Sequence, residues 1–121
     1  YQKELHSSGL ELPQVTEGAL SSWHLYVIST PKHWGPTARD QFLLKLREQG
    51  IQANLHYTPV PSFVFYRGIK RKKQGINSAQ WPKAEAYGKR AISLPIFPNL
   101  KQLDRQKIVK KLTCLSNNFL K

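Results

Sequence analysis

The most regular hydrophobic pattern in the chain lies close to its C-terminal end. Ile108, Leu112, Leu115 and Phe119 recur every three or four residues, and lysines occupy many of the positions between them. Side chains at this spacing share one face of an α-helix. The pattern therefore predicts an amphipathic helix whose apolar stripe faces a core and whose lysine-rich face is solvated.

A second helix is predicted by the pattern that follows Thr37. Its apolar residues again fall on one helical face, at Ala38, Phe42, Leu43 and Leu46. Thr37 suits the N-cap, and Asp40 is an acidic residue three positions further on. Gly50 suits the residue that ends a helix in the left-handed conformation, so a helix from about 38 to 49 is expected.

Three segments have the composition or the alternation of β-strands. Residues 22–30 and 91–97 are rich in β-branched and aromatic residues. Residues 51–57 alternate between apolar and polar side chains, and two prolines close the run soon afterwards. In an extended strand, one face would carry Ile51, Ala53, Leu55 and Tyr57, and the other Gln52, Asn54 and His56.

Shorter elements follow from glycine and proline. Residues 1–9 resemble the end of a helix, here expected to be an interdomain helix, that stops at Gly9. Residues 62–68 favour a short helical turn or a loop. Pro82 suits the first turn of a helix that runs to about Arg90.

The order of these elements is helix end, strand, helix, strand, short helix, helix, strand and helix. Such an order predicts one α+β domain over residues 1–121. We expect a small, mainly antiparallel sheet of three to four strands, with helices packed on one face.

Composition narrows the class of protein. The chain has 121 residues, of which 40% are hydrophobic and 21% charged, and this suits a single folded domain. Cys114 is the single cysteine, so no internal disulfide can form, and a reducing cytoplasm is the expected location. No apolar run approaches the ~18 residues of a membrane span, so no membrane partner is expected. Because methionine is absent and the chain starts at Tyr1, we expect an excised piece of a longer protein.

The charge is strongly uneven. The net charge is +12, and the whole excess lies in residues 67–121. The densest basic cluster lies in residues 67–80, which we expect to form an exposed loop, and it contains Arg67, Lys70, Arg71, Lys72 and Lys73. Tyr66 and Trp81 flank it, so a polyanion such as RNA is an alternative ligand, through stacking and phosphate contacts. No nucleic-acid-binding motif accompanies the charge, so a solvated basic loop is favoured and nucleic acid is not expected.

The sequence contains none of the short motifs that would indicate a complete active site. The four histidines and the cysteine lack the spacing of metal ligands, and no metal site is expected. There is no phosphate-binding loop, dinucleotide fingerprint or nucleophile elbow. We therefore assign no catalytic residue in this chain.

Longer segments carry a resemblance to a known family. They are SSWHLYVIS, LREQGIQANLHYTPV and WPKAEAYGKRAISLPIFPNL, in that order. Together they resemble the C-terminal small domain of the DegT/DnrJ/StrS family of sugar aminotransferases, over nearly all of the chain from about Leu10. The resemblance implies a pyridoxal-phosphate enzyme that passes an amine from glutamate to a nucleotide-linked keto-sugar, for polysaccharide or glycoside biosynthesis.

The same resemblance implies what this chain lacks. In that family the lysine that binds the cofactor, the aspartate that pairs with its ring nitrogen and most phosphate contacts lie in a large N-terminal domain. That domain would be the partner of this chain, in a homodimer whose active sites draw on both subunits. We expect the chain alone to bind no cofactor covalently and to be inactive.

The candidate substrate contacts implied by the resemblance are His56, Tyr57 and Tyr66. From the alternation, His56 would face the sugar-nucleotide cleft, while Tyr57 would pack towards the core. A His56 satisfied by backbone groups is an equally open alternative, and packing under the basic loop is favoured for Tyr66. Two positions depart from the family pattern: Pro61 replaces a second histidine, and Lys101 replaces the usual Ser or Thr before the last helix.

Overall fold

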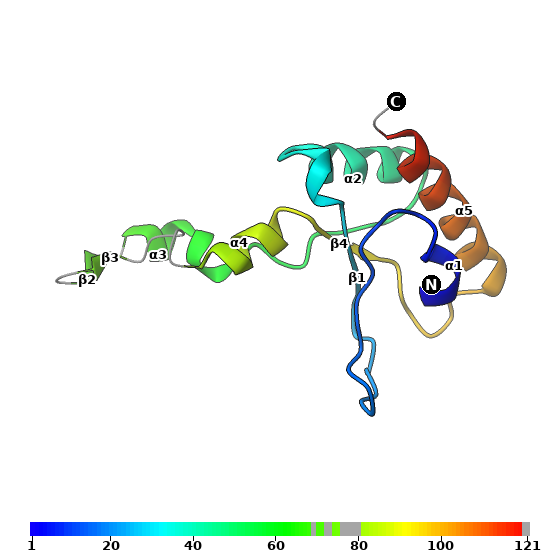
Figure 1. The fold of residues 1–121 in the computed structure, drawn as a ribbon, viewed down its shortest axis with the longest axis horizontal. Coiled ribbons are helices and arrows are strands. Elements are labelled where there is room, and N and C mark those ends of the chain that lie inside the picture. Colours follow the sequence, from blue (N-terminus) through cyan, green and yellow to red (C-terminus); the bar gives the residue numbers. More distant parts are fainter. Residues whose placement is uncertain (69, 72–73, 76–80, 120–121) are drawn as a thin grey trace.

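Two paired strands form the centre of the molecule in a computed structural model (Figure 1). The structure describes residues 1–68, 70–71, 74–75 and 81–119, and it describes side chains outside residues 67–80. Strands β1 (Tyr26–Ser29) and β4 (Ala91–Leu94) are antiparallel, with Tyr26 opposite Leu94 and Ser29 opposite Ala91. The α+β class and the antiparallel pairing are thus confirmed, whereas a third or fourth strand of this sheet is not confirmed in the described residues.

Single bridges extend the sheet on both edges. Glu11 pairs with Ser29 of β1, and Asn54 pairs with Ser93 of β4. Arg90 stabilises the first edge, since its Nη1 lies 2.7 Å from Glu11 Oε1. The predicted strand over 51–57 is therefore wrong. Only Asn54 exchanges backbone hydrogen bonds with β4, and the chain leaves the sheet edge after it.

The helices begin and end close to the predicted residues. The long helices are α2 (Ala38–Glu48) and α5 (Gln102–Asn118), and the shorter elements are α1 (Gln2–Leu5), η1 (Lys32–Trp34), η2 (Val60–Ser62), α3 (Val64–Gly68), β2 (Lys70–Arg71), β3 (Gln74–Gly75) and α4 (Pro82–Gly88). Gly50 has φ +78°, which confirms its place after α2. Thr37 is the N-cap residue of α2 as predicted, but its side chain makes no capping hydrogen bond.

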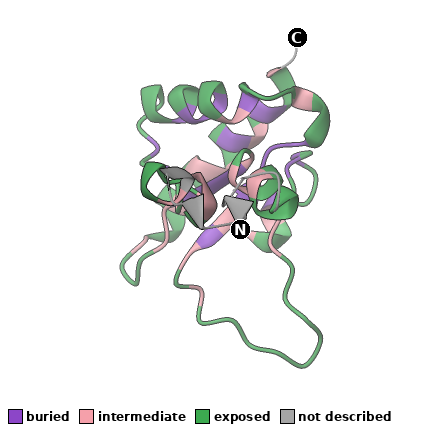
Figure 2. Ribbon diagram, turned by 90° about the vertical axis from the view of Figure 1, so that its left-hand side faces the viewer, coloured by how far each residue is buried: buried purple, intermediate pink, exposed green. Residues whose placement is uncertain are grey.

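The core lies between one face of the sheet and the helices. Tyr26, Ile28, Ile92 and Leu94 share that face in the antiparallel register, and all four are buried. They meet the predicted apolar faces of the helices, where Ala38, Phe42, Leu43, Leu46 and Leu112 are also buried. Figure 2 shows this buried centre beneath helices whose outer surfaces are exposed. The predicted packing of helices on a sheet face thus follows from two amphipathic patterns that meet.

Three aromatic rings pack against one another at the end of the core where η1, α2 and the C-terminal end of α5 meet. Trp34 stacks on Phe119 with ring centroids 4.5 Å apart, and Phe42 meets both rings edge-on at 5.3 Å. Offset and edge-on contacts are the favoured geometries for aromatic rings. The cluster ties η1, α2 and the residue that follows α5 together.

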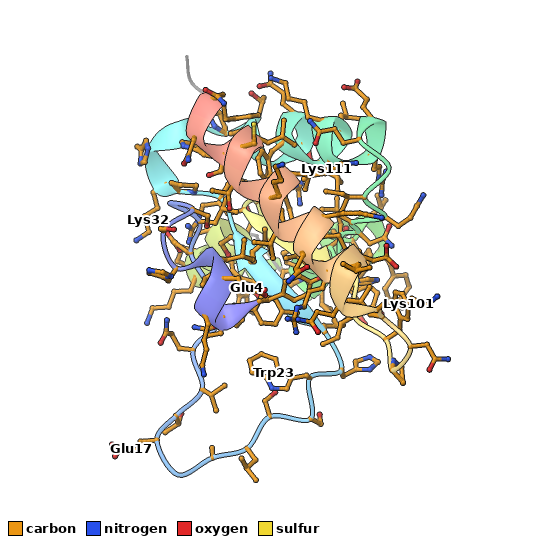
Figure 3. The ribbon with its side chains drawn as sticks, turned by 90° about the vertical axis from the view of Figure 1, so that its right-hand side faces the viewer. Glu4, Glu17, Trp23, Lys32, Lys101 and Lys111 are labelled. Carbon is orange, nitrogen blue, oxygen red and sulfur yellow. The ribbon has the colours of Figure 1, made fainter. Side chains whose placement is uncertain are left out.

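The N-terminal segment packs beside α5. Tyr1 donates a hydrogen bond from its hydroxyl to the Pro95 carbonyl, and Tyr26 donates one to Gln2 Oε1. Burial raises the pKa of Tyr1 to about 12 and also raises the pKa of Tyr26. Trp23 lies at the base of a long loop that projects from this end (Figure 3). That α1 is the end of an interdomain helix stays a prediction.

The elements α3, β2, β3 and α4 extend away from the core (Figure 1). Val64 and Phe65 of α3 are exposed. None of the described helices combines the length and the apolarity that crossing a membrane requires.

Candidate functional site

The turn that leaves the sheet edge carries the two principal candidates. After Asn54, the chain runs through His56 and Tyr57 to Pro59 and then into η2. The rings of His56 and Tyr57 lie with centroids 4.9 Å apart and nearly edge-on. Tyr57 is 73% exposed, so the prediction that it packs towards the core is wrong. The predicted alternation holds only as far as Asn54, because the chain beyond it has no strand partner.

Both rings line the same pocket, which has a volume of about 200 Å³. Its walls come from the turn after Asn54, the N-terminal end of α2, α4 with Lys89 directly after it, and Ala91 at the start of β4. The polar and ionisable lining residues that matter here are Arg39, His56, Tyr57, Ser62, Glu85 and Lys89. The structure therefore brings the motif residues together with charged groups that lie far from them in sequence.

Hydrogen bonds fix the walls of this pocket. Ser62 donates from Oγ to Glu85 Oε1 at 3.0 Å, which joins the turn to α4. Lys89 Nζ lies 3.8 Å from the other oxygen of Glu85. Arg39 donates from Nη1 to the Gly88 carbonyl at 2.8 Å, which joins α4 to α2. Because Arg39 follows the buried Ala38, these contacts connect the pocket to the core.

The lining groups suit a polar, hydroxylated or anionic ligand. Arg39 and Lys89 supply positive charge, and Tyr57 and Ser62 supply hydroxyls that donate and accept hydrogen bonds. Glu85 supplies one carboxylate, which accepts hydrogen bonds from hydroxyl groups. Charge-assisted bonds of this kind are stronger than neutral ones.

Two pocket residues have a buried nitrogen without a hydrogen-bond partner among the described residues, Arg39 at Nε and His56 at Nδ1, and Arg39 Nε is paired with the Asp40 carboxylate. A buried polar atom without a partner raises the free energy of the folded state. No described group satisfies Nδ1 of His56, so the backbone-satisfied alternative for this nitrogen is not seen.

The pocket offers no buried lysine among its described residues for a covalently bound pyridoxal phosphate. Lys89 is the lysine among the residues that line the His56 pocket, and its side chain is 67% exposed. Its amine lies 3.8 Å from Glu85 Oε2. A lysine that binds a carbonyl cofactor must lose its proton, which burial promotes, and Lys89 is not buried.

The other predicted residues lie elsewhere. Tyr66 lies on α3 and is not one of the residues that line the pocket, so its contact with substrate stays a prediction. The side chains of the polyanion candidates lie outside the described part of the structure, namely Arg67, Lys70, Arg71, Lys72 and Lys73. Within the described residues, no group of three His, Cys, Asp or Glu side chains is placed to hold a metal ion.

Sequence reasoning missed four of the lining residues: Arg39, Ser62, Glu85 and Lys89. Glu85 lies in the PKAEAY segment that helped to identify the resemblance, and Lys89 follows it by one helical turn. That spacing was the available signal for both. Arg39 and Ser62 carry no signal of their own, because their place in the pocket depends on how α2 and the turn pack.

Comparison with known proteins gives relatives over nearly the whole chain. The family model of the DegT/DnrJ/EryC1/StrS aminotransferase family matches residues 1–113. A pleiotropic regulatory protein of Geobacillus stearothermophilus is 34% identical over 107 residues, which cover 88% of this chain and 26% of the relative. The spore coat polysaccharide biosynthesis protein SpsC of Bacillus subtilis is 28% identical over 103 residues, which cover 84% of this chain and 25% of the relative.

Solved structures agree with this. The protein named "Putative sugar aminotransferase Spr1654" of Streptococcus pneumoniae, in its PLP form, matches with a TM-score of 0.84 and 26% identity, over 99% of this chain and 29% of that one. An aminotransferase of Helicobacter pylori involved in pseudoaminic acid biosynthesis shares the fold, with a TM-score of 0.81 and 23% identity over 98% of this chain and 30% of that one. The chain thus spans about a quarter of the length of the curated relatives it matches. Its sequence, its fold and the motif at its pocket agree, and the chain belongs to the DegT/DnrJ/EryC1/StrS aminotransferase family.

Proposed function

We propose that this chain is the C-terminal small domain of a pyridoxal-phosphate-dependent nucleotide-sugar aminotransferase, and that it caps the active-site cleft. The observation that carries the proposal is the pocket in which His56 and Tyr57 meet Arg39, Glu85 and Lys89. In a member of this family, a pocket of hydroxyl, imidazole and charged groups suits a sugar nucleotide. The curated relative named for polysaccharide biosynthesis supports the same substrate class.

The remaining parts of the activity would come from the longer protein. A large domain would hold pyridoxal phosphate, since the described lysine of the pocket does not fit that role. The amine would come from glutamate and pass to a keto-sugar, in a cytoplasmic homodimer. In that protein we also expect the sheet of β1 and β4 to have three to four strands, with the segment that bridges at Glu11 lengthened into one of them.

Within the site, the residues of this chain would bind and orient the sugar nucleotide. Tyr57 and Glu85 would exchange hydrogen bonds with hydroxyls of the sugar, and the buried Nδ1 of His56 would gain a partner. Arg39 and Lys89 would favour the negative charge of the diphosphate. Their effect would be to hold the sugar in one orientation, which lowers the entropic part of the barrier.

Substrate binding can be tested on the chain itself. UDP-glucose and dTDP-glucose are titrated while NMR follows the ring signals of His56 and Tyr57, with the exposed His6 as an internal control. We expect the His56 and Tyr57 signals to shift and the His6 signal to stay. His56→Ala should weaken binding roughly tenfold, the loss that follows from one hydrogen bond to a charged group. Equal shifts of all three residues, or no shift at millimolar ligand, would contradict the proposal.

Cofactor binding is tested separately. Incubation with pyridoxal phosphate should give no absorbance band of a lysine-bound cofactor, and borohydride should trap none. A strong band that borohydride fixes to one lysine would refute the proposal that the cofactor is bound by the large domain and not by this chain.

A further inference from the structure

Helix α4 and the turn that carries His56 approach each other unusually closely at one point. Gly88 is the last residue of α4, and the Pro59 ring occupies the space next to its Cα. A Cβ atom at Gly88 would lie 2.5 Å from Pro59 Cγ and 2.7 Å from Pro59 Cδ. Carbon atoms without a bond between them settle at about 3.5–4.0 Å, so one of the two segments would have to move by about 1 Å.

Glycine is required at position 88 because of the limited space beside its Cα, and not because of a positive φ angle. The glycines with positive φ in the described residues are Gly9, Gly18, Gly35 and Gly50, and Gly88 is not among them. An alanine at a helical backbone position is ordinarily more stable than glycine, by up to about 1 kcal/mol. The Pro59 ring is what opposes alanine here, and a proline ring cannot rotate away as a long side chain can.

Both segments are held in place on either side of this contact. Arg39 fixes the Gly88 carbonyl from α2, and the apolar face of α2 belongs to the core. On the side of the turn, Ser62 is fixed to Glu85 of α4. Because hydrogen bonds tether both α4 and the turn, neither segment can shift freely when the Gly88–Pro59 contact is widened. The movement has to pass along the turn, and Tyr57 and His56 lie two and three residues before Pro59.

We propose that Gly88 is a positioning residue for the candidate site. It sets the distance between α4 and the turn through Pro59, and thereby places the His56 and Tyr57 rings in the pocket. This inference rests on the proposed function in one respect, since the position of the rings matters to substrate only if they contact the sugar nucleotide. The placement of the rings itself can be measured without any ligand.

The test uses four variants of the 121-residue chain: Gly88→Ala, Pro59→Ala, the double variant, and Ala86→Gly as the matched control. Pro59→Ala removes the Cγ and Cδ atoms that oppose the new methyl group, and it keeps a Cβ that would lie 4.0 Å away. Ala86 is an exposed residue of the same helix, so the control changes one methyl group without touching the turn.

We expect Gly88→Ala to shift the His56 and Tyr57 ring signals and to weaken their mutual nuclear Overhauser contact. The signals of His6 should stay in place. The double variant should return the two rings to the positions that they have in Pro59→Ala alone, and Ala86→Gly should move neither. UDP-glucose binding should weaken about tenfold or more in Gly88→Ala and recover in the double variant relative to Pro59→Ala, since each hydrogen bond to a charged group that the displaced rings lose costs about tenfold or more.

Unchanged ring signals in Gly88→Ala would overturn the inference. A shift that persists in the double variant would also overturn it, because the effect would then not pass through Pro59. If Gly88→Ala does not fold, a folded double variant still supports the inference and an unfolded one overturns it. A wild-type chain that binds no sugar nucleotide, but whose rings move and recover as described, would refute the proposed function and leave the positioning role intact.

Discussion

Among the side chains of α2, Phe42 should contribute the most to the free energy of unfolding. Its side chain is fully buried, and its ring meets Trp34 and Phe119 edge-on at 5.3 Å. Replacing a buried phenylalanine by alanine costs about 3–5 kcal/mol, through lost burial and the cavity that remains. A domain of this length has a total stability of about 6–18 kcal/mol at the usual value per residue, so Phe42→Ala should remove a large part of it.

Phe42→Leu separates the two contributions. Leucine keeps most of the apolar volume, so the packing cost should stay below about 1.5 kcal/mol. The two edge-on ring contacts are lost as well, at about 0.5–1.5 kcal/mol each. These parts give a total between about 1 and 4.5 kcal/mol, and the loss should be smaller than that of the alanine variant measured beside it.

Urea unfolding followed by circular dichroism and tryptophan fluorescence measures both changes. Leu44→Ala is the matched control, because Leu44 lies on the same helix and is 58% exposed. It should change the free energy of unfolding by no more than about 0.5 kcal/mol. If Phe42→Ala costs no more than Leu44→Ala, the helix does not pack on this core as described.

Three further changes test other parts of the structure. The neutral hydroxyls of Tyr1 and Tyr26 are favoured in the folded state, so the stability they confer is present below about pH 10 and is lost as the pH rises towards 12; Tyr1→Phe should reduce this alkaline loss in urea unfolding at stepped pH. Gly50→Ala places a Cβ at φ +78°, so thermal unfolding should show a loss of about 1–2 kcal/mol. Ser116→Ala removes the hydrogen bond from Ser116 Oγ to the buried Ser8 carbonyl, and a loss of about 1–3 kcal/mol in urea unfolding is expected.

The helices were predictable because their signals are local. The apolar face of α2 and the glycine after it both lie within one continuous segment, and the structure buries the residues that the pattern selects. Ile51 and Ala53 are also buried as the alternation predicts. The strand expected beyond them does not form, since a strand needs a partner and β4 reaches only Asn54. The alternation of apolar and polar residues in one segment does not predict how far a partner strand extends beside it.

The candidate site was predictable only in part, for a similar reason. His56 and Tyr57 belong to one short motif, so the resemblance pointed to both. The expectation that they occupy opposite faces depended on the missing strand and failed with it. Arg39 and Lys89 reach the pocket from α2 and from the end of α4, and no pattern within either helix predicts that meeting.

The pairing of β1 with β4 has a consequence for how the chain folds and how it can vary. Ser29 and Ala91 are directly opposed, so the central pairing closes a loop of about 60 residues. This pairing is strongly non-local, and we expect it to form late and to limit the folding rate. Loop-closure entropy grows only slowly with length, by about 0.6 kcal/mol per doubling. By this entropy alone, lengthening or shortening the loop between α3 and α4 by a few residues should change the free energy of unfolding little.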